Sequence, residues 1–351
     1  MAHIKIAGAG LGGLSAAISL AQAGISTEVF EMNRDCGCRF HGDLQGIENW
    51  SYEEDALSHL KNMNLKIGFE YKPVSSVKIT NFRESALVSS NRPGFYLLKR
   101  GAEKGTLDQS LKEQALSCGV KINFSKKIPE SEADIIATGP LGRKIFGVDS
   151  GIVFKTEMDD IYEMLLDDSV AYQGYSYLLV VDGYACLCTV LFDKFKDVNG
   201  CFKKTKEFFV KKYNLTIKNE KTVGGIGHFS LRPTFVKGKS LLVGESAGIQ
   251  DMLFGFGIRS SLYSGYLAAQ SIMNHKDRAK KYDIAAKKAF SNKIKASFVN
   301  RFFWNRLGSD YGLVIKALRK SKDPMKLIGR VYDYTIFHRM CYPFLRWKEK
   351  L

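Results

Sequence analysis

Apolar residues near the start of the chain follow three patterns in succession. Residues 3–7 read HIKIA and residues 27–31 read TEVFE, two short segments of strand character. Between them, a glycine-rich turn leads into an apolar helical pattern that ends near Gly24. The order predicts a strand, a tight turn, a helix and a second strand.

Three glycines stand where this turn would meet a ligand. Gly8 permits the sharp turn out of the first strand, Gly10 lets backbone N–H groups approach a pyrophosphate, and Gly13 lets the helix pack closely on the sheet. Glu31 follows about twenty residues further on, where a carboxylate accepts hydrogen bonds from a ribose. Because the motif has its strand, its helix and its acid, we expect a dinucleotide site rather than a chance glycine turn.

The pattern continues with alternating helices and strands. It predicts helices over residues 52–68 and 106–118, strands over 77–79, 85–89, 95–98 and 120–124, and an irregular glycine-rich stretch over 36–46. A buried strand over 133–137 runs into a turn at Thr138 and Gly139. This strand is expected to return the chain to the nucleotide-binding sheet, beside the first glycine loop.

Residues 151–236 are rich in strand signals. Apolar runs over 175–181 and 184–192 are joined by Asp182 and Gly183, a strong hairpin signal. A helix is expected over 202–213. An antiparallel sheet inserted between two parts of a dinucleotide-binding domain would build a substrate site at the domain boundary.

The predicted fold class is therefore α/β, with three regions. Residues 1–72, 100–150 and 237–285 form a discontinuous Rossmann-like domain, residues 73–99 and 151–236 form a strand-rich substrate domain, and residues 286–351 form a helical C-terminal region.

A second glycine-rich stretch, residues 240–259, precedes a long helix to about Asn274. With it, the sequence resembles the FAD-dependent p-hydroxybenzoate hydroxylase-type flavoprotein superfamily, and within it the geranylgeranyl reductase-like branch. Three features carry this resemblance over about the first 275 residues: the N-terminal glycine motif with its acid, the strand from Asp134 to Gly139, and the late motif at 243–248. It implies bound FAD and reduction of isoprenoid double bonds.

The resemblance also implies roles for individual residues. The N-terminal motif would hold the ADP half of FAD, Arg100 would lie near the cofactor, Gly139 beside the adenosine end, Gly244 and Glu245 at the ribityl and pyrophosphate portion, and Gly255 to Gly257 at the ring. The full predicted cofactor-binding set is Gly8, Gly10, Leu11, Gly12, Gly13, Glu31, Met32, Arg39, Arg100, Gly139, Gly244, Glu245, Gly255, Phe256, Gly257 and Ile258. Two positions depart from the family pattern, which has Asp at 245 and Pro at 252, where this chain has Glu and Met.

Chemistry supports the role of the ring loop independently. Peptide N–H groups of Gly255 to Gly257, at the start of a helix, would stabilise negative charge on a reduced ring. The catalytic residue is left open among Cys38, His41 and Asp251, with a capping role for Asp251 equally favoured. His228 is a further candidate proton donor, but a surface or satisfied histidine is the better interpretation of both histidines.

Cysteine spacing does not favour a metal site. Cys36 and Cys38, like Cys186 and Cys188, are separated by one residue, whereas zinc pairs are usually spaced more widely. We therefore predict no metal. The odd count of seven cysteines also favours reduced thiols over a disulfide framework.

Positive charge is concentrated at the C-terminal end. Of the formal net charge of +16, residues 271–351 contribute +14, from 20 Lys and Arg against 6 Asp and Glu. Aromatic residues are interleaved with these cations, and the stretches 298–307 and 325–340 place apolar residues at helical spacing. An interfacial membrane segment and ordinary packed helices are both consistent with this pattern, and nucleic acid is disfavoured.

Targeting signals are not evident. The glycine motif starts at residue 8, which leaves no room for a signal peptide, and no apolar run has the length of a membrane span. A cytoplasmic protein is expected, with peripheral attachment to the inner face of the membrane left open.

The leading hypothesis is an FAD-dependent reductase of an isoprenoid or related lipid. Because the chain has one dinucleotide motif, a reduced pyridine nucleotide would bind transiently, and ferredoxin or a reduced deazaflavin could equally supply electrons. The alternatives are a flavin monooxygenase or halogenase acting on an aromatic substrate, and a non-catalytic flavin-binding membrane adaptor.

Overall fold

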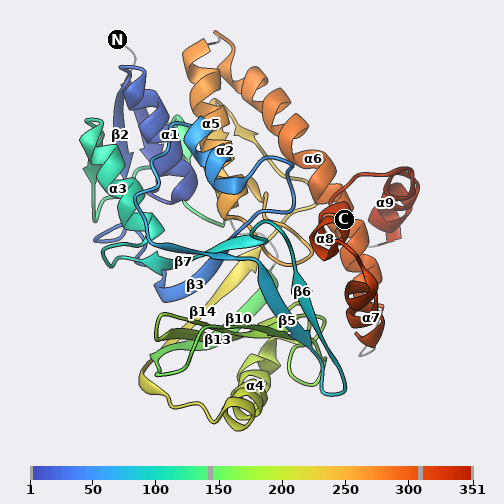
Figure 1. The fold of residues 1–351 in the computed structure, drawn as a ribbon. Coiled ribbons are helices and arrows are strands. Elements are labelled where there is room, and N and C mark those ends of the chain that lie inside the picture. The colour runs from blue at the N-terminus through green and yellow to red at the C-terminus, as the bar shows by residue number, and fades with distance from the viewer. Residues whose placement is uncertain (1–2, 141–144, 275, 307–310, 349–351) are drawn as a thin grey trace.

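A six-stranded, mostly parallel sheet forms the first layer of the computed structural model, which describes residues 3–140, 145–274, 276–306 and 311–348 (Figure 1). Its order is β15 (Val236–Lys237), β16 (Ser240–Leu242), β9 (Ile135–Ile136), β1 (His3–Ala7), β2 (Ser26–Phe30) and β8 (Lys121–Asn123). Only β15 and β16 pair in antiparallel fashion. The predicted return of the strand at 133–137 to this sheet is confirmed, because β9 pairs with β1 in parallel.

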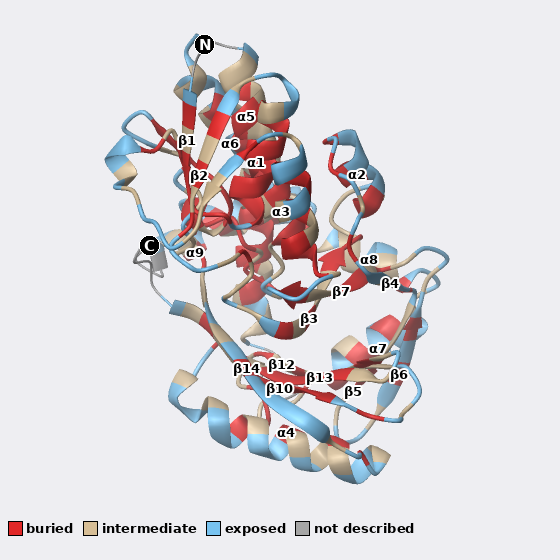
Figure 2. Cartoon of the chain, turned by 90° about the vertical axis from the view of Figure 1, so that its left-hand side faces the viewer, coloured by how far each residue is buried: buried red, intermediate tan, exposed pale blue. Residues whose placement is uncertain are grey.

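Helix α1 (Leu11–Gln22) lies at the centre of this domain and is buried from Leu11 to Leu20 (Figure 2). It packs on α3 (Leu107–Ser117) and on α5 (Ile258–Asn274). The contact with α5 is close enough that a Cβ atom on Gly265 would lie 2.1 Å from the Gly12 carbonyl oxygen. This contact joins the N-terminal glycine motif to the helix that follows the second glycine-rich stretch.

The second layer is a seven-stranded sheet, shown at the bottom of Figure 1. Its order is β14 (Lys218–His228), β10 (Ile145–Lys155), β13 (Tyr184–Leu191), β12 (Tyr175–Val181), β11 (Ile161–Leu165), β5 (Ser76–Thr80) and β6 (Ser85–Ser89). The predicted hairpin is confirmed: β12 pairs with β13, and Asp182 and Gly183 both adopt positive φ at its turn. Helix α4 (Val198–Tyr213) covers the outer face of the sheet.

A three-stranded sheet joins the two layers, with β7 (Phe95–Gly101) between β3 (His41–Glu48) and β4 (Tyr71–Val74). The prediction of an irregular stretch over 36–46 is wrong from residue 41 onward, because β3 forms an antiparallel ladder with β7. The predicted domain boundaries at 72, 99 and 150 fall inside β4, β7 and β10, respectively.

The helix predicted over 52–68 is much shorter in the structure. Helix α2 spans Ala56–Asn62 because the Asp55 side chain accepts hydrogen bonds from the N–H groups of Leu57 and Ser58, which fixes the N-terminus. Asn64, with φ of +58°, ends it. The helix predicted over 106–118 is confirmed as α3, with Thr106 as its N-cap and Gly119 following at φ of +83°.

The C-terminal region is helical, as predicted. It contains α6 (Arg278–Trp304), α7 (Gly312–Lys320), α8 (Pro324–Arg330) and α9 (Ile336–Lys348). Phe298 and Val299 of α6 are buried, so the start of the first basic aromatic stretch packs into the core, whereas Phe303 is exposed and Leu307 lies outside the described residues. The second stretch is divided between α8 and α9. None of the helices in the described ranges has the length and apolar character needed to cross a bilayer.

The fold class is confirmed: a Rossmann-like domain, an antiparallel sheet built from the inserted segments, and C-terminal helices.

Candidate functional site

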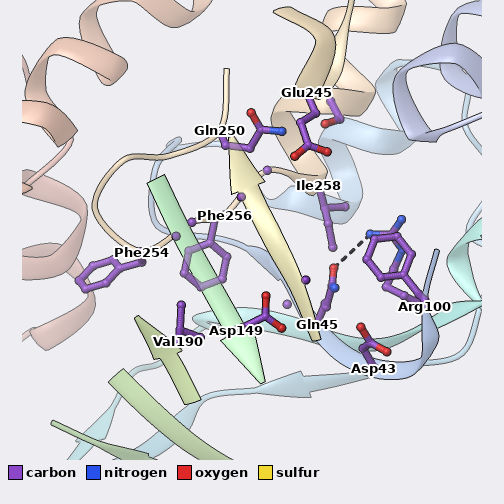
Figure 3. Close-up of a pocket in the computed structure, with 18 of the residues that line it drawn as sticks. Asp43, Gln45, Arg100, Asp149, Val190, Glu245, Gln250, Phe254, Phe256 and Ile258 are labelled. Atoms are coloured by element: carbon purple, nitrogen blue, oxygen red, sulfur yellow. Dashed lines mark hydrogen bonds between the residues drawn. The ribbon is translucent and has the colours of Figure 1, made fainter. Parts of the chain in front are cut away.

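A continuous cavity of about 1240 Å³ lies between the two larger sheets. It begins at Gly8 to Gly12 in the N-terminal motif, passes the loop from Gly255 to Ile258, and ends among apolar residues of α7 and α8. Figure 3 shows part of it, where side chains of the three-stranded sheet, of the seven-stranded sheet and of residues 245–258 converge on one space. Every predicted cofactor-binding residue except Gly13 lines this cavity.

The N-terminal glycines differ in what surrounds them. At Gly8, with φ of +98°, a Cβ would lie 2.4 Å from the Ala137 carbonyl oxygen, and at Gly13 it would lie 2.2 Å from the Gly8 carbonyl oxygen. These two positions are therefore restricted by the protein itself. Gly10 is different, because a Cβ there would meet only the Ala137 oxygen, at 3.5 Å. The space over Gly10 belongs to the cavity.

Glu31 holds the glycine loop from the adjacent strand. One carboxylate oxygen accepts a hydrogen bond from the Ala9 N–H at 2.8 Å, and the other accepts two from Asn33, at 2.8 Å and 2.7 Å. Glu31 is buried, and it lines the cavity beside Met32, which is exposed. The carboxylate is thus positioned for the hydroxyl groups of a ribose at the glycine-rich end of the cavity.

Side chains of the second glycine-rich stretch contact two other parts of the cavity wall, at Arg39 and Gly139. Arg39 forms an ion pair of 2.5 Å with Glu245 and donates to the Ile226 carbonyl at 3.1 Å. Ser246 donates to the Gly139 carbonyl at 2.9 Å. The longer side chain of Glu245, which departs from the family pattern, therefore reaches Arg39 on the opposite wall.

Arg100 is fixed in the cavity wall by Asp108. The guanidinium donates two hydrogen bonds of 2.8 Å to the Asp108 carboxylate and one of 3.1 Å to Gln45, drawn as a dashed line in Figure 3. It also lies over the Phe40 ring at 4.1 Å. Asp108 therefore has a structural role that its place in the first turn of a helix did not reveal.

We expect Asp108→Ala to lower the free energy of unfolding by about 3–5 kcal/mol, because it leaves a buried guanidinium without its partner. Asp35→Ala is the matched control. Its ion pair with Lys112 is partly exposed and should contribute less than about 1 kcal/mol. Urea denaturation measures both values, and equal losses would contradict this assignment.

The loop from Gly255 to Gly257 leads into the N-terminus of α5, and its Gly255 N–H donates to the Asp251 carbonyl oxygen at 3.0 Å. Phe256 packs edge-to-face on Trp50, with ring centroids 4.9 Å apart. Close by, the side chain of Gln250 lines the cavity, and its Oε1 atom is buried with no hydrogen-bonding partner among the described residues. A buried amide oxygen of this kind needs a donor. An isoalloxazine ring has N–H groups that can supply one, so the loop fits FAD.

Asp251 shapes this loop and does not line the cavity. Its carboxylate accepts hydrogen bonds from the N–H groups of Leu253 and Phe254, at 3.0 Å and 2.7 Å, and from the Tyr332 hydroxyl at 3.0 Å. The sequence analysis favoured a capping role for Asp251 equally. In the structure Asp251 does cap backbone N–H groups, but those of a turn rather than of a helix. We withdraw it as a catalytic candidate, because its oxygens are used by the backbone.

The other two catalytic candidates lie apart. His41 is exposed at the start of β3 and does not line the cavity, so it is no longer a catalytic candidate. Cys38 lines the cavity, whereas Cys36 is buried behind it and burial strongly raises the pKa of its thiol. Cys186 and Cys188 are likewise buried, on β13. No cluster of three or more metal-ligating side chains occurs in the part of the chain that the structure describes.

Asp149 is a functional candidate that the sequence interpretation missed. It lies on β10 and faces the cavity between Phe256 and Gln45 (Figure 3). Burial, together with the like charge of Asp43, raises its pKa to about 6, against weaker opposing effects from Arg39, Cys188 and the Gly225 N–H. A protonated carboxyl group is therefore available in the cavity at mildly acidic pH.

Comparisons with known proteins agree with this architecture. A model described as an NAD(P)-binding Rossmann-like domain matches residues 6–51. The sequence has no significant match among curated proteins.

Solved structures share the whole fold. A geranylgeranyl bacteriochlorophyll reductase-like protein from Thermoplasma acidophilum superposes with a TM-score of 0.73 at 17% identity, covering 96% of this chain and 98% of that one. A flavin-dependent brominase gives 0.64 at 14% identity, with 99% of both chains covered. A variant of 2-methyl-3-hydroxypyridine-5-carboxylic acid oxygenase gives 0.57 at 15% identity, with 95% and 97% covered. The chain thus has the fold of FAD-dependent oxidoreductases, as the sequence resemblance predicted.

Proposed function

We propose that this protein is an FAD-dependent oxidoreductase that reduces carbon–carbon double bonds of an isoprenoid or related lipid. The observation that carries the proposal is the distribution of side chains along the cavity. Its glycine-rich end is polar, whereas its far end is lined by apolar residues of the sheet and of the C-terminal helices: Val77, Ile79, Val88, Leu166, Val314, Leu318, Met325 and Ile328. The cavity also exceeds the roughly 300–1,000 Å³ typical of small-ligand sites.

The chain's residues would divide the work along this cavity. The glycine loops, Glu31 and Arg39 would hold the two ends of FAD, which supplies a hydride when it is bound in its reduced form. The apolar chamber would hold the hydrocarbon chain of the substrate and exclude water from the site. Asp149, between these regions, would deliver a proton to one carbon of the double bond, while the other carbon accepts the hydride.

The decisive experiment reduces the purified holoprotein with dithionite under anaerobic conditions and adds polyprenyl lipids of different lengths. Reoxidation of the flavin, together with a product that carries two more hydrogens per reduced double bond, supports the proposal. Rapid oxygen consumption stimulated by an aromatic substrate, without such a product, would favour the monooxygenase or halogenase alternative. Flavin that no acceptor reoxidises would favour the non-catalytic adaptor.

A substitution at the far end of the cavity should change chain-length preference. We expect Val314→Trp to lower kcat/KM for the longest accepted lipid by roughly 10- to 200-fold relative to a short analogue, because the indole occupies space needed by the chain. Leu313→Trp is the control, since Leu313 neighbours Val314 on α7 but is exposed and lies outside the cavity lining. Competition between short and long lipids in detergent measures the ratio, and an unchanged ratio in Val314→Trp would argue against a chain-binding chamber.

A further inference from the structure

The outer face of α9 carries a row of large apolar side chains that the described part of the protein leaves uncovered. The exposed fractions are 74% for Ile336, 50% for Phe337, 74% for Met340, 60% for Phe344 and 77% for Trp347. These positions follow helical spacing and share one side of the helix. A contiguous exposed apolar patch of this kind marks an interaction surface rather than ordinary surface composition.

Packing against α6 fixes the direction of this row. Tyr342 and His338 on the opposite side of α9 are buried, and the Tyr342 ring lies 6.0 Å from that of Phe298. The His338 Nε2 and Asn300 Oδ1 atoms are 3.3 Å apart. Because its inner face is already occupied, α9 presents the apolar row outward.

Basic side chains accompany the row on α9 and on the helix beneath it. On α9, Arg339 is exposed and Arg346 is half-buried, and the Lys295 Nζ atom of α6 lies 5.6 Å from the centre of the Tyr342 ring. No Asp or Glu occurs between Ile336 and Lys348, so the charge of this helix is positive. Aromatic and aliphatic residues flanked by Lys and Arg are the composition that binds the interface of an anionic bilayer.

The cavity reaches the surface beside this helix. Phe303 lines the cavity, is 42% exposed, and lies 5.4 Å from the Phe337 ring of the apolar row. Asn300, whose Oδ1 atom pairs with His338 of α9, also lines the cavity. The apolar end of the cavity and the outward face of α9 therefore share a border.

We propose that α9 binds the surface of an anionic membrane, with its apolar row in the headgroup region, so that the opening of the cavity at Phe303 faces the bilayer. Membrane binding by α9 stands on the surface alone. The entry of a lipid through this mouth rests on the proposed function.

Vesicle flotation tests the docking without any assay of activity. The FAD-loaded full-length protein is mixed at low salt with vesicles of phosphatidylcholine, with or without phosphatidylglycerol. We expect flotation with the anionic vesicles, and weakening of binding by about tenfold or more in the double variant Phe344→Ser, Trp347→Ser. Leu87→Ser, which removes a 69% exposed apolar side chain on β6, should bind like the wild type.

Several results would overturn the docking proposal. The first two are failure of the wild type to float with anionic vesicles and equal flotation of the double variant. The third is a wild-type dimer in solution that dissociates in the double variant, because a second copy of the chain would then cover α9. Retained flavin absorbance and an unchanged melting temperature establish that the double variant is folded.

The two proposals can fail separately. If both hold, the double variant loses turnover of a lipid embedded in anionic vesicles but keeps turnover of a short analogue in detergent. Flotation without turnover of any polyprenyl lipid would refute the reductase while leaving the docking intact. Equal turnover of the embedded lipid by the wild type and the double variant would refute entry from the bilayer.

Discussion

Asp149→Asn lowers the rate at which substrate reoxidises the reduced holoprotein by about 10²- to 10⁴-fold, if Asp149 delivers the proton. Binding of FAD at the N-terminal glycine motif and Glu31 should be retained, because Asp149 lies on β10 of the seven-stranded sheet, outside the sheet that carries this motif. Single-turnover absorbance under anaerobic conditions measures the rate of this step directly. A rate within about threefold of the wild type would remove Asp149 from the proposal, because the loss of a general acid should lower the rate by about 100-fold or more.

The pH dependence of the same step distinguishes a proton donor from a residue that only shapes the cavity. Burial and Asp43 raise the Asp149 pKa to about 6, so the protonated form is lost as the pH rises through this value. The wild-type rate should therefore fall above about pH 6, whereas the residual rate of the Asn variant should be independent of pH there. Asp43→Asn removes a like charge, lowers the Asp149 pKa, and should move the fall to lower pH. A profile that Asp43→Asn leaves in place would contradict this electrostatic assignment.

Thermal unfolding provides a second readout, independent of activity. A carboxyl group whose pKa is higher in the folded than in the unfolded protein favours folding at low pH and opposes it once the pH exceeds the folded value. Asp149→Asn should therefore raise the melting temperature more at pH 8 than at pH 4. A gain of stability together with a loss of rate is expected where a site keeps a strained charge for function.

Local sequence patterns were sufficient to predict which residues form the glycine-rich end of the cavity. The turn at Gly8, the tight packing at Gly13 and the hairpin at Asp182 each depend on backbone conformation within a few residues, and such requirements are written in residue type. The two glycine-rich stretches were also expected to bind opposite ends of one cofactor. In the structure both line the same cavity, and α1 packs on α5, the helix that follows the second stretch.

Asp149 could not be found in this way. Its raised pKa depends on Asp43 from β3 and on burial in a cavity formed by separate sheets, and its neighbours along the chain carry no signal of this. The same limit explains why the sequence analysis named His41 as a catalytic candidate although it does not line the cavity. It lies close in sequence to Cys38, but the strand that begins at residue 41 directs the two side chains to different environments.

In the C-terminal region, helical periodicity did not reveal which apolar residues are buried and which are exposed. The stretches 298–307 and 325–340 have similar compositions, yet Phe298 is buried against Tyr342 while Phe337 and Met340 are exposed. A helical repeat defines an apolar face without identifying what that face meets. Only the tertiary structure separates the part that packs on the body from the part available to a membrane.

Gly10→Ala should lower the affinity for FAD by about 10- to 150-fold, with little change in the stability of the apoprotein. Gly10 has φ of −74° and ψ of 175°, which alanine adopts without strain, and its Cβ would make only one ordinary contact, at 3.5 Å. In the cavity, however, the methyl group would occupy the position from which backbone N–H groups reach the pyrophosphate. Loss of one charge-assisted hydrogen bond, worth about 1.5–3 kcal/mol, gives the stated range.

Two matched variants isolate this effect. Gly13→Ala places a Cβ 2.2 Å from the Gly8 carbonyl oxygen, so it should destabilise the apoprotein by about 1–3 kcal/mol or more. Gly200→Ala, in α4, has no atom within 4 Å of the new Cβ and should be neutral or slightly stabilising, with unchanged FAD affinity. Fluorescence titration of apoprotein with FAD, paired with urea denaturation, gives both quantities for each variant. If Gly10→Ala binds FAD as tightly as the wild type, the space above this turn does not hold the pyrophosphate, and the assignment of the cavity to FAD fails at its first contact.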